Sequence, residues 1–224
     1  MSSVAEIELS FDYRSQRWRD AWTGLEALSR RTGYAMDRLT PELKQALAAY
    51  ITKSLQMLAE RHSGAYPGGT GPNSLAKRSG RLGRALRRPP KVTGTKLNNV
   101  EGQWKLPFYA GVHETGKIIV AKGAYLTIPL PAALNRNGTP KKPSARHWDR
   151  TFVKKSKKGN LIIFRRDGAN IVPLYVLKKS VKIPPRMGMR SVLQAGVPEF
   201  VDVAMSRMLD RLAAELAAQS TGGA

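Results

Sequence analysis

The sequence contains no cysteine. Disulfide bonds, thiolate ligands for zinc and a cysteine nucleophile are therefore excluded. Acidic residues are scarce: 16 Asp and Glu stand against 38 Lys and Arg, giving the 224-residue chain a formal net charge of +22. No apolar run reaches the roughly 18–20 residues that span a bilayer, and the first residues lack the pattern of a signal peptide. We expect a protein made in the cytoplasm, with no membrane partner.

The positive charge predicts an acidic partner, either nucleic acid, an anionic surface or acidic faces of other proteins. Seven basic and no acidic residues lie between Lys77 and Lys91, and residues 135–160 hold nine basic residues against one acid. In the first segment, Arg81, Arg84 and Arg88 fall on one face of a predicted short helix. Aromatic side chains are few in both segments, so for nucleic acid the pattern supports only nonspecific backbone contact.

Little in the sequence resembles an active site. The three histidines (His62, His113 and His147) lie far apart in the chain and lack the spacing of a zinc motif. The most enzyme-like pair is His113–Glu114, a base beside a carboxylate. Adjacent residues on a helix, however, point about 100° apart and do not readily hydrogen-bond to each other. We expect no enzyme activity, no bound metal and no cofactor.

Hydrophobic periodicity predicts three main helices. The first covers 15–31, with Trp18 and Trp22 packed in the core, and Gly33 ends it. The second and clearest covers 40–62, with Thr40 as its N-cap and Pro41 in the first helical position. The last begins at about Pro198 and runs to Gln219.

Period-two alternation and turn residues predict strands in the rest of the chain. The expected strands cover 1–13, 92–97, 100–106, 118–120, 125–130, 151–155, 161–165, 171–176 and 181–183. The turn Lys158-Gly159-Asn160 predicts a hairpin between 151–155 and 161–165, and a proline marks 125–130 as an edge strand. Glycine and proline predict a loop or mobile arm over 63–73.

The centre of the chain is the stretch Pro107 to Gly116. Phe108, Tyr109 and Val112 form the apolar face of a predicted helical turn, which Pro107 opens and Gly116 closes. The fold class we predict is α+β: an antiparallel or mixed sheet flanked by a long N-terminal and a C-terminal helix, with an extended basic β-hairpin arm. We expect one domain over 1–224, with a strand-like arm (1–13), the Gly/Pro loop (63–73) and a basic arm (131–165).

Three short motifs occur in a fixed order along this pattern: Ser79-Gly80-Arg81-Leu82, then Tyr109 to Gly116, then Pro184-Pro185-Arg186 before the last helix. In this order the chain resembles the tail-completion proteins of long-tailed bacteriophages, the group that includes the minor tail protein Z of lambda-like phages. The resemblance covers roughly residues 40–215. The positions that carry it, with structural roles, are Gly80, Leu82, Tyr109, Val112, Glu114, Gly116, Pro184 and Arg186.

The resemblance implies a non-enzymatic virion protein assembled in the host cytoplasm. Such proteins form rings, commonly hexameric, that complete the tail tube at the head–tail junction and dock it to the head connector. Their partners would be the tail tube protein, connector or stopper proteins and, without sequence specificity, the passing DNA. The alternatives are another neck or head-closure component and a basic, nonspecific DNA-binding protein. For subunit or neighbour-ring contacts the sequence offers Arg81, Arg84, Arg88, Lys154, Lys155, Lys157 and Lys158.

Overall fold

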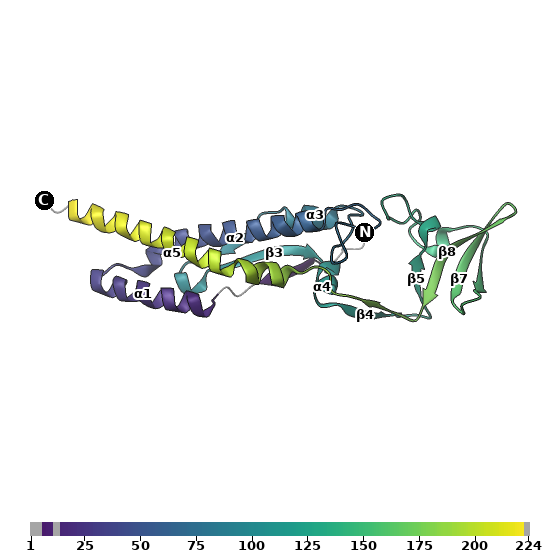
Figure 1. Cartoon of the computed structure of the whole chain (residues 1–224), viewed down its shortest axis with the longest axis horizontal. Coiled ribbons are helices and arrows are strands. Elements are labelled where there is room, and N and C mark those ends of the chain that lie inside the picture. The colour runs from purple at the N-terminus through teal and green to yellow at the C-terminus, as the bar shows by residue number, and fades with distance from the viewer. Residues whose placement is uncertain (1–5, 11–13, 222–224) are drawn as a thin grey trace. The chain divides into compact units, whose positions relative to one another are not determined.

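A computed structural model describes residues 6–10 and 14–221 (Figure 1). It consists of helices and antiparallel sheets, which confirms the α+β class. The chain divides into two compact units: unit 1 comprises residues 1–59, 84–108 and 188–224, and unit 2 comprises 60–83 and 109–187. The expectation of a single domain stays a prediction. Of the predicted strand over 1–13, residues 1–5 and 11–13 lie outside the described residues.

Unit 1 combines three helices with a small antiparallel sheet. Its elements are β1 (Glu6–Ser10), α1 (Gln16–Thr32), the 3-10 helix η1 (Met36–Leu39), α2 (Thr40–Arg61, whose last two residues belong to unit 2), β2 (Lys91–Thr93), the 3-10 helix η2 (Leu97–Asn99), β3 (Glu101–Pro107) and α5 (Met189–Thr221). The strand order is β1-β3-β2. The described part of the predicted arm therefore pairs with β3 of its own chain. The strand expected over 92–97 ends at Thr93, before η2.

The ends of α1 follow the sequence signals, whereas the start of α2 does not. The Ser15 hydroxyl caps α1 by accepting from the Trp18 amide, and Gly33 ends the helix with φ +66°. Thr40 already has helical dihedral angles, because η1 leads directly into α2. Its hydroxyl donates backward to the Asp37 carbonyl at 2.7 Å. The prediction of Thr40 as an N-cap is therefore wrong.

The core of unit 1 lies between α2, α5 and β3. The predicted stripe of α2 is buried, namely Leu43, Leu47, Ile51, Leu55 and Leu58. Strand β3 approaches this stripe at Gly102, where a Cβ would lie 2.2 Å from the Ile51 side chain. Trp18 and Tyr50 each pack on Phe200 of α5, at ring distances of 6.1 and 5.1 Å. The prediction that Trp18 is a core residue is confirmed, whereas Trp22, predicted with it, is only half-buried.

Helix α5 starts nine residues before its predicted beginning, so Pro198 lies inside it. Proline inside a helix removes a hydrogen bond, which normally favours a break or a kink. Here Tyr50 of α2 packs on Gly196 and donates its hydroxyl proton to the Leu193 carbonyl, just before the proline. This tertiary contact stabilises the helix at a point where local sequence favours interruption.

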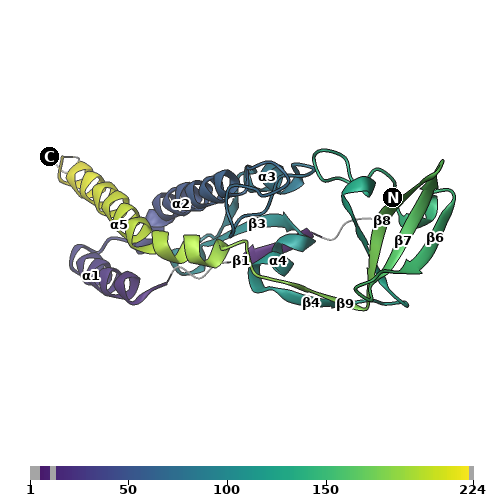
Figure 2. The ribbon, with the colours of Figure 1, turned by 45° about the vertical axis from the view of Figure 1, so that its right-hand side comes forward.

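Unit 2 is mostly strand and loop. It contains α4 (Phe108–Thr115, with Phe108 assigned to unit 1), β4 (Lys117–Val120), β5 (Leu126–Pro129), the 3-10 helices η3 (Pro131–Ala133) and η4 (Ala145–His147), β6 (Thr151–Lys155), β7 (Leu161–Asp167), β8 (Asn170–Lys178) and β9 (Ser180–Ile183). Strands β4 and β9 form a two-stranded ribbon. The other four strands form an antiparallel sheet in the order β5-β8-β7-β6 (Figure 1 and Figure 2). The edge position predicted for 125–130 is confirmed.

A β-bulge shapes the core of the four-stranded sheet. Ile163 pairs with Tyr175, but Phe164 pairs with Pro173, so Leu174 is an extra residue on β8. Both Leu174 and Tyr175 are buried, in a cluster with Ala133 and Ala145 of the segment that covers this face. The bulge also accommodates Pro173, which cannot donate to a ladder, within a central strand.

The basic hairpin forms as predicted, with Thr151 paired to Arg165 and Lys155 to Leu161. It is, however, one half of a four-stranded sheet, and residues 131–148 pack against that sheet rather than extend from it. The description of 131–165 as an extended arm is therefore corrected. The Gly/Pro loop is likewise held internally: the Ser74 hydroxyl accepts from the Thr70 and Gly71 amides, and Lys77 donates its amide proton to the Gly64 carbonyl.

Candidate functional site

Two of the motifs that carry the phage resemblance meet in unit 2. The carbonyl of His113, in α4, accepts the backbone amides of Arg186 at 2.6 Å and of Met187 at 2.9 Å. A segment about 70 residues further along the chain thereby closes over the end of α4. We call this contact between α4 and residues 183–187 the motif joint. Pro184 and Arg186 are exposed within it, and a role for them in orienting α5 stays a prediction.

Glycine is required at the motif joint for two physical reasons. Gly116 ends α4 with φ +72°, a conformation that side chains rarely adopt. A Cβ at this position would also lie 3.0 Å from Cδ of Pro185 and 3.1 Å from the Ile183 carbonyl oxygen. Gly80 of the first motif has φ +69°, and Leu82 beside it is buried. These motif positions are therefore explained by backbone geometry and packing.

The helical turn predicted between Pro107 and Gly116 is confirmed as α4, but the largest residues of its apolar face are not buried. Phe108 is 52% exposed and Tyr109 is 36% exposed, whereas Ala110 is buried. His113 and Glu114, three and four residues after Ala110, share its face and are half-buried. Val112 is half-buried as well. The helix thus turns its polar pair toward the protein and leaves its largest apolar side chains on the surface.

His62 is a buried polar residue whose hydrogen bonds could not be predicted from the sequence. Its ring is 5% exposed and is held at both nitrogens: the Leu75 amide donates to Nδ1 at 3.0 Å, and Nε2 lies 3.0 Å from the Met187 carbonyl oxygen. Because Nδ1 accepts a proton donor, the proton must be on Nε2, which donates to Met187. The ring is therefore neutral. Burial lowers the pKa of His62, and the charge of Arg61 also lowers it, which favours the same neutral form.

His113 is the second histidine that contacts Met187, and it is half-buried. Burial lowers the pKa of His113, and the positive charge of Arg186 lowers it further. Its Nδ1 is buried and has no hydrogen-bond partner among the described residues. His62 and His113 are far apart in the chain, but both bind Met187: the His62 ring bonds the Met187 carbonyl, and the His113 carbonyl accepts the Met187 amide. Across residues 6–10 and 14–221, no three His, Asp or Glu side chains form a metal-sized group.

The predicted basic contacts fall in separate places. Helix α3 covers Arg81–Leu86 and stops two residues before Arg88, which precedes two prolines. The expected face of three arginines on one helix is therefore wrong. The division between the units falls inside α3, so Arg81 belongs to unit 2 and Arg84 and Arg88 to unit 1. The hairpin lysines (Lys154, Lys155, Lys157 and Lys158) are all exposed and lie close together in unit 2.

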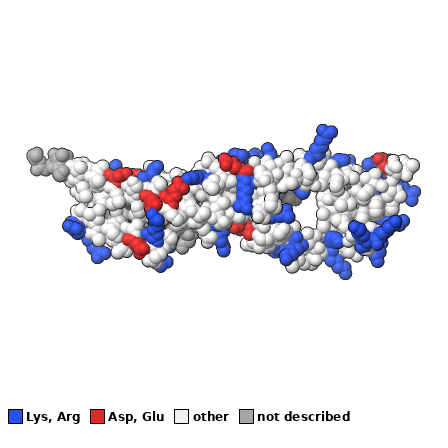
Figure 3. Space-filling model, viewed as in Figure 1, with Lys and Arg blue, Asp and Glu red and all other residues white. Residues whose placement is uncertain are grey.

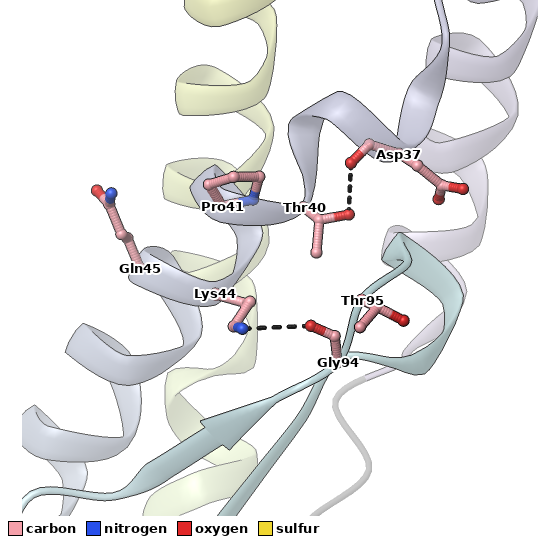
Figure 4. Close-up of a pocket in the computed structure, with 7 residues that line it drawn as sticks. All are labelled: Asp37, Thr40, Pro41, Lys44, Gln45, Gly94 and Thr95. Carbon is pink, nitrogen blue, oxygen red and sulfur yellow. Dashed lines mark hydrogen bonds between the residues drawn. The ribbon is translucent and has the colours of Figure 1, made fainter.

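An open cavity of about 480 Å³ lies in unit 1 (Figure 4). It is lined by Asp37, Thr40, Pro41, Lys44, Gln45, Gly94 and Thr95. The Lys44 ammonium donates to the Gly94 carbonyl at 3.2 Å, and a carboxylate oxygen of Asp37 accepts the Leu97 amide at 3.2 Å. These charged groups are thus used to hold η1, α2 and the turn before η2 together. The arrangement is structural and presents no convergent set of reactive groups.

No family model, no curated protein and no solved structure matches this chain. The fold therefore defines only the structural class of the chain, an α+β protein with antiparallel sheets. Within the part of the chain that the structure describes, no helix has the length and apolar character to cross a bilayer.

Proposed function

We propose that the protein is a structural virion component of a long-tailed phage. It forms a ring that completes the tail tube and docks it to the head connector. The observation that carries this proposal is the ordered motif set, of which two members meet at the motif joint through backbone hydrogen bonds. A structural component is consistent with motif positions whose requirements are steric. Gly116, which must be glycine for its φ and its close neighbours, is the clearest example.

The surface that best suits subunit contact is the β4–β9 ribbon. All four residues of β4 are exposed, and its three apolar side chains are 60%, 38% and 65% exposed at Ile118, Ile119 and Val120. Two strands alone are marginally stable in water, and exposed apolar strands favour pairing with further chains. In the proposed ring, this ribbon packs against a neighbouring subunit. Arg84 and Arg88 remain candidates for contacts with acidic faces.

The test is the mass of the purified protein in solution, measured by sedimentation velocity over a wide concentration range, alone and with isolated phage tails. We expect either a concentration-dependent ring or a monomer that assembles on tail ends. Ile118→Asp should abolish assembly because it places a carboxylate in an apolar contact. Ile171→Asp is the matched control, since both isoleucines lie on strands of unit 2 and are 60% exposed. A strict monomer that ignores tails would contradict the proposal.

A further inference from the structure

The charge of the protein is divided unevenly between its two units. Unit 2 holds 21 Lys and Arg against 4 Asp and Glu, a net charge of +17. Unit 1 holds 17 Lys and Arg against 12 Asp and Glu, a net charge of +5. On the face shown in Figure 3, basic side chains gather over the strands of unit 2. Most of the electrostatic attraction for anions therefore originates in unit 2.

The densest group of cations is the lysine tip, which we define as Lys154, Lys155, Lys157 and Lys158. All four side chains are exposed, and among the described residues none forms an ion pair or donates a hydrogen bond. The two acids nearest along the chain, Asp149 and Asp167, lie beyond the opposite end of the hairpin from the turn. The lysine tip thus concentrates four charges without a counter-charge.

The backbone holds the lysine tip in a fixed position. The Ser156 amide donates to the Asn160 carbonyl at 2.8 Å, and Gly159, with φ +78°, donates to the Ser156 carbonyl at 2.9 Å. The Lys178 ammonium of β8 donates to the Asn160 side chain at 2.6 Å, which fastens the turn to the central strand. The ammonium groups therefore project from a braced turn.

Protection of a sheet edge against pairing with another strand explains only two of the four lysines of the lysine tip. Lysine on an edge strand discourages unwanted strand pairing, and β6 is an edge strand that carries Lys154 and Lys155. Lys157 and Lys158 lie in the turn, where no edge is exposed, so protection does not explain them.

We propose that the lysine tip binds the phosphodiester backbone of nucleic acid without sequence specificity. A duplex presents one negative charge per about 1.7 Å of its axis, a nearly continuous row of anions. The lysine ammonium is a point charge on a flexible stem. It is therefore better suited to bind a row of phosphates than to bind carboxylates at fixed positions on a protein. This inference goes beyond the ring proposal and does not depend on it, because it assigns the lysines to nucleic acid instead of a subunit contact.

The test is the salt dependence of affinity for a random-sequence DNA duplex, measured by fluorescence anisotropy. If four phosphates are neutralised, the lysine tip contributes about 3 to 4 to the slope of log K against log salt. Replacing all four lysines by glutamine should reduce the slope by that amount and lower affinity about 100-fold or more at low salt. A single-stranded oligonucleotide should show a smaller slope, about −0.7 per phosphate contacted.

The matched control removes four charges from unit 1, at Arg19, Arg31, Lys91 and Lys105, which are all exposed and form no ion pair with any side chain that the structure describes. Both variants have the same net charge, so only the position of the removed charges differs. We expect the control to keep most of the affinity and slope. Equal losses in the two variants would overturn the proposal, as would absence of DNA binding at low salt. Binding of poly-glutamate as tight as that of DNA at equal charge would also overturn it, in favour of an acidic protein.

Discussion

The motif joint makes a sharp prediction for Gly116→Ala. Alanine in a left-handed backbone conformation costs about 1–2 kcal/mol. The new methyl group would also meet Pro185 and the Ile183 carbonyl at 3.0–3.2 Å, where rigid backbone atoms must move. We estimate a combined cost of about 2–3 kcal/mol, within the usual range for strain at a special backbone position.

The assay is amide hydrogen exchange at Arg186 and Met187, whose protons are bound by the His113 carbonyl. If the motif joint opens more readily by about 2–3 kcal/mol, these two amides should exchange about 30- to 140-fold faster. Gly123→Ala is the control, because no atom lies within 4 Å of a Cβ there and its φ is not in the left-handed region. It should leave exchange unchanged or slightly slower.

Equal exchange at Arg186 and Met187 in the Gly116→Ala and Gly123→Ala proteins would refute the reasoning. It would mean that α4 can end without a left-handed glycine, or that the segment after β9 is not held by α4. Circular dichroism of both variants is needed beside the exchange measurement, so that a local opening is distinguished from loss of the whole fold.

Two further predictions concern buried polar groups. Because burial lowers the pKa of His62 and His113, the unfolded chain takes up protons first as the pH falls, so stability present above about pH 6.5 should decline below it. Thermal unfolding measured from pH 8 to pH 5 checks this. The variant His62→Gln, whose side chain can still accept and donate hydrogen bonds, should reduce the decline in stability. An unaltered decline would exclude His62 as its source. Tyr50→Phe removes the hydroxyl donor to Leu193 and should cost about 1–3 kcal/mol in urea unfolding. The exposed Tyr125→Phe should cost nothing measurable, and equal costs would contradict the role given to Tyr50.

Elements whose signals are local could be predicted from the sequence. Ser15 and Gly33 mark the two ends of α1, and the turn at Gly159 fixes the β6–β7 register. Pro129 marks β5 as an edge strand. Each of these signals acts within a few residues, through a cap, a left-handed glycine or a missing amide proton.

The start of α5 could not be predicted, because it depends on a residue 143 positions away. Pro198 resembles a helix start in isolation. In the structure, Tyr50 packs on Gly196 and donates to Leu193, so the turn before the proline is stabilised by another helix. The same limit applies to α4, where Phe108, Tyr109 and Val112 were predicted to share one apolar face and two of the three side chains are exposed. Spacing identifies residues that share a face, but burial depends on which face the rest of the chain covers.

The contacts of His62 and His113 with Met187 show how far the motif set itself supports a function. Both residues bind Met187 because a backbone segment after β9 closes over α4, and each contact that holds this segment is steric or involves main-chain atoms. Any chain with this joint would need a left-handed glycine at position 116, whatever its task. The motifs therefore bear most directly on how unit 2 is built. In the two proposals, function is expressed by surfaces that unit 2 presents, the apolar β4–β9 ribbon and the lysine tip. Because Ile118→Asp and the four-lysine variant alter these surfaces without touching the joint, they separate ring assembly from nucleic-acid binding within one fold.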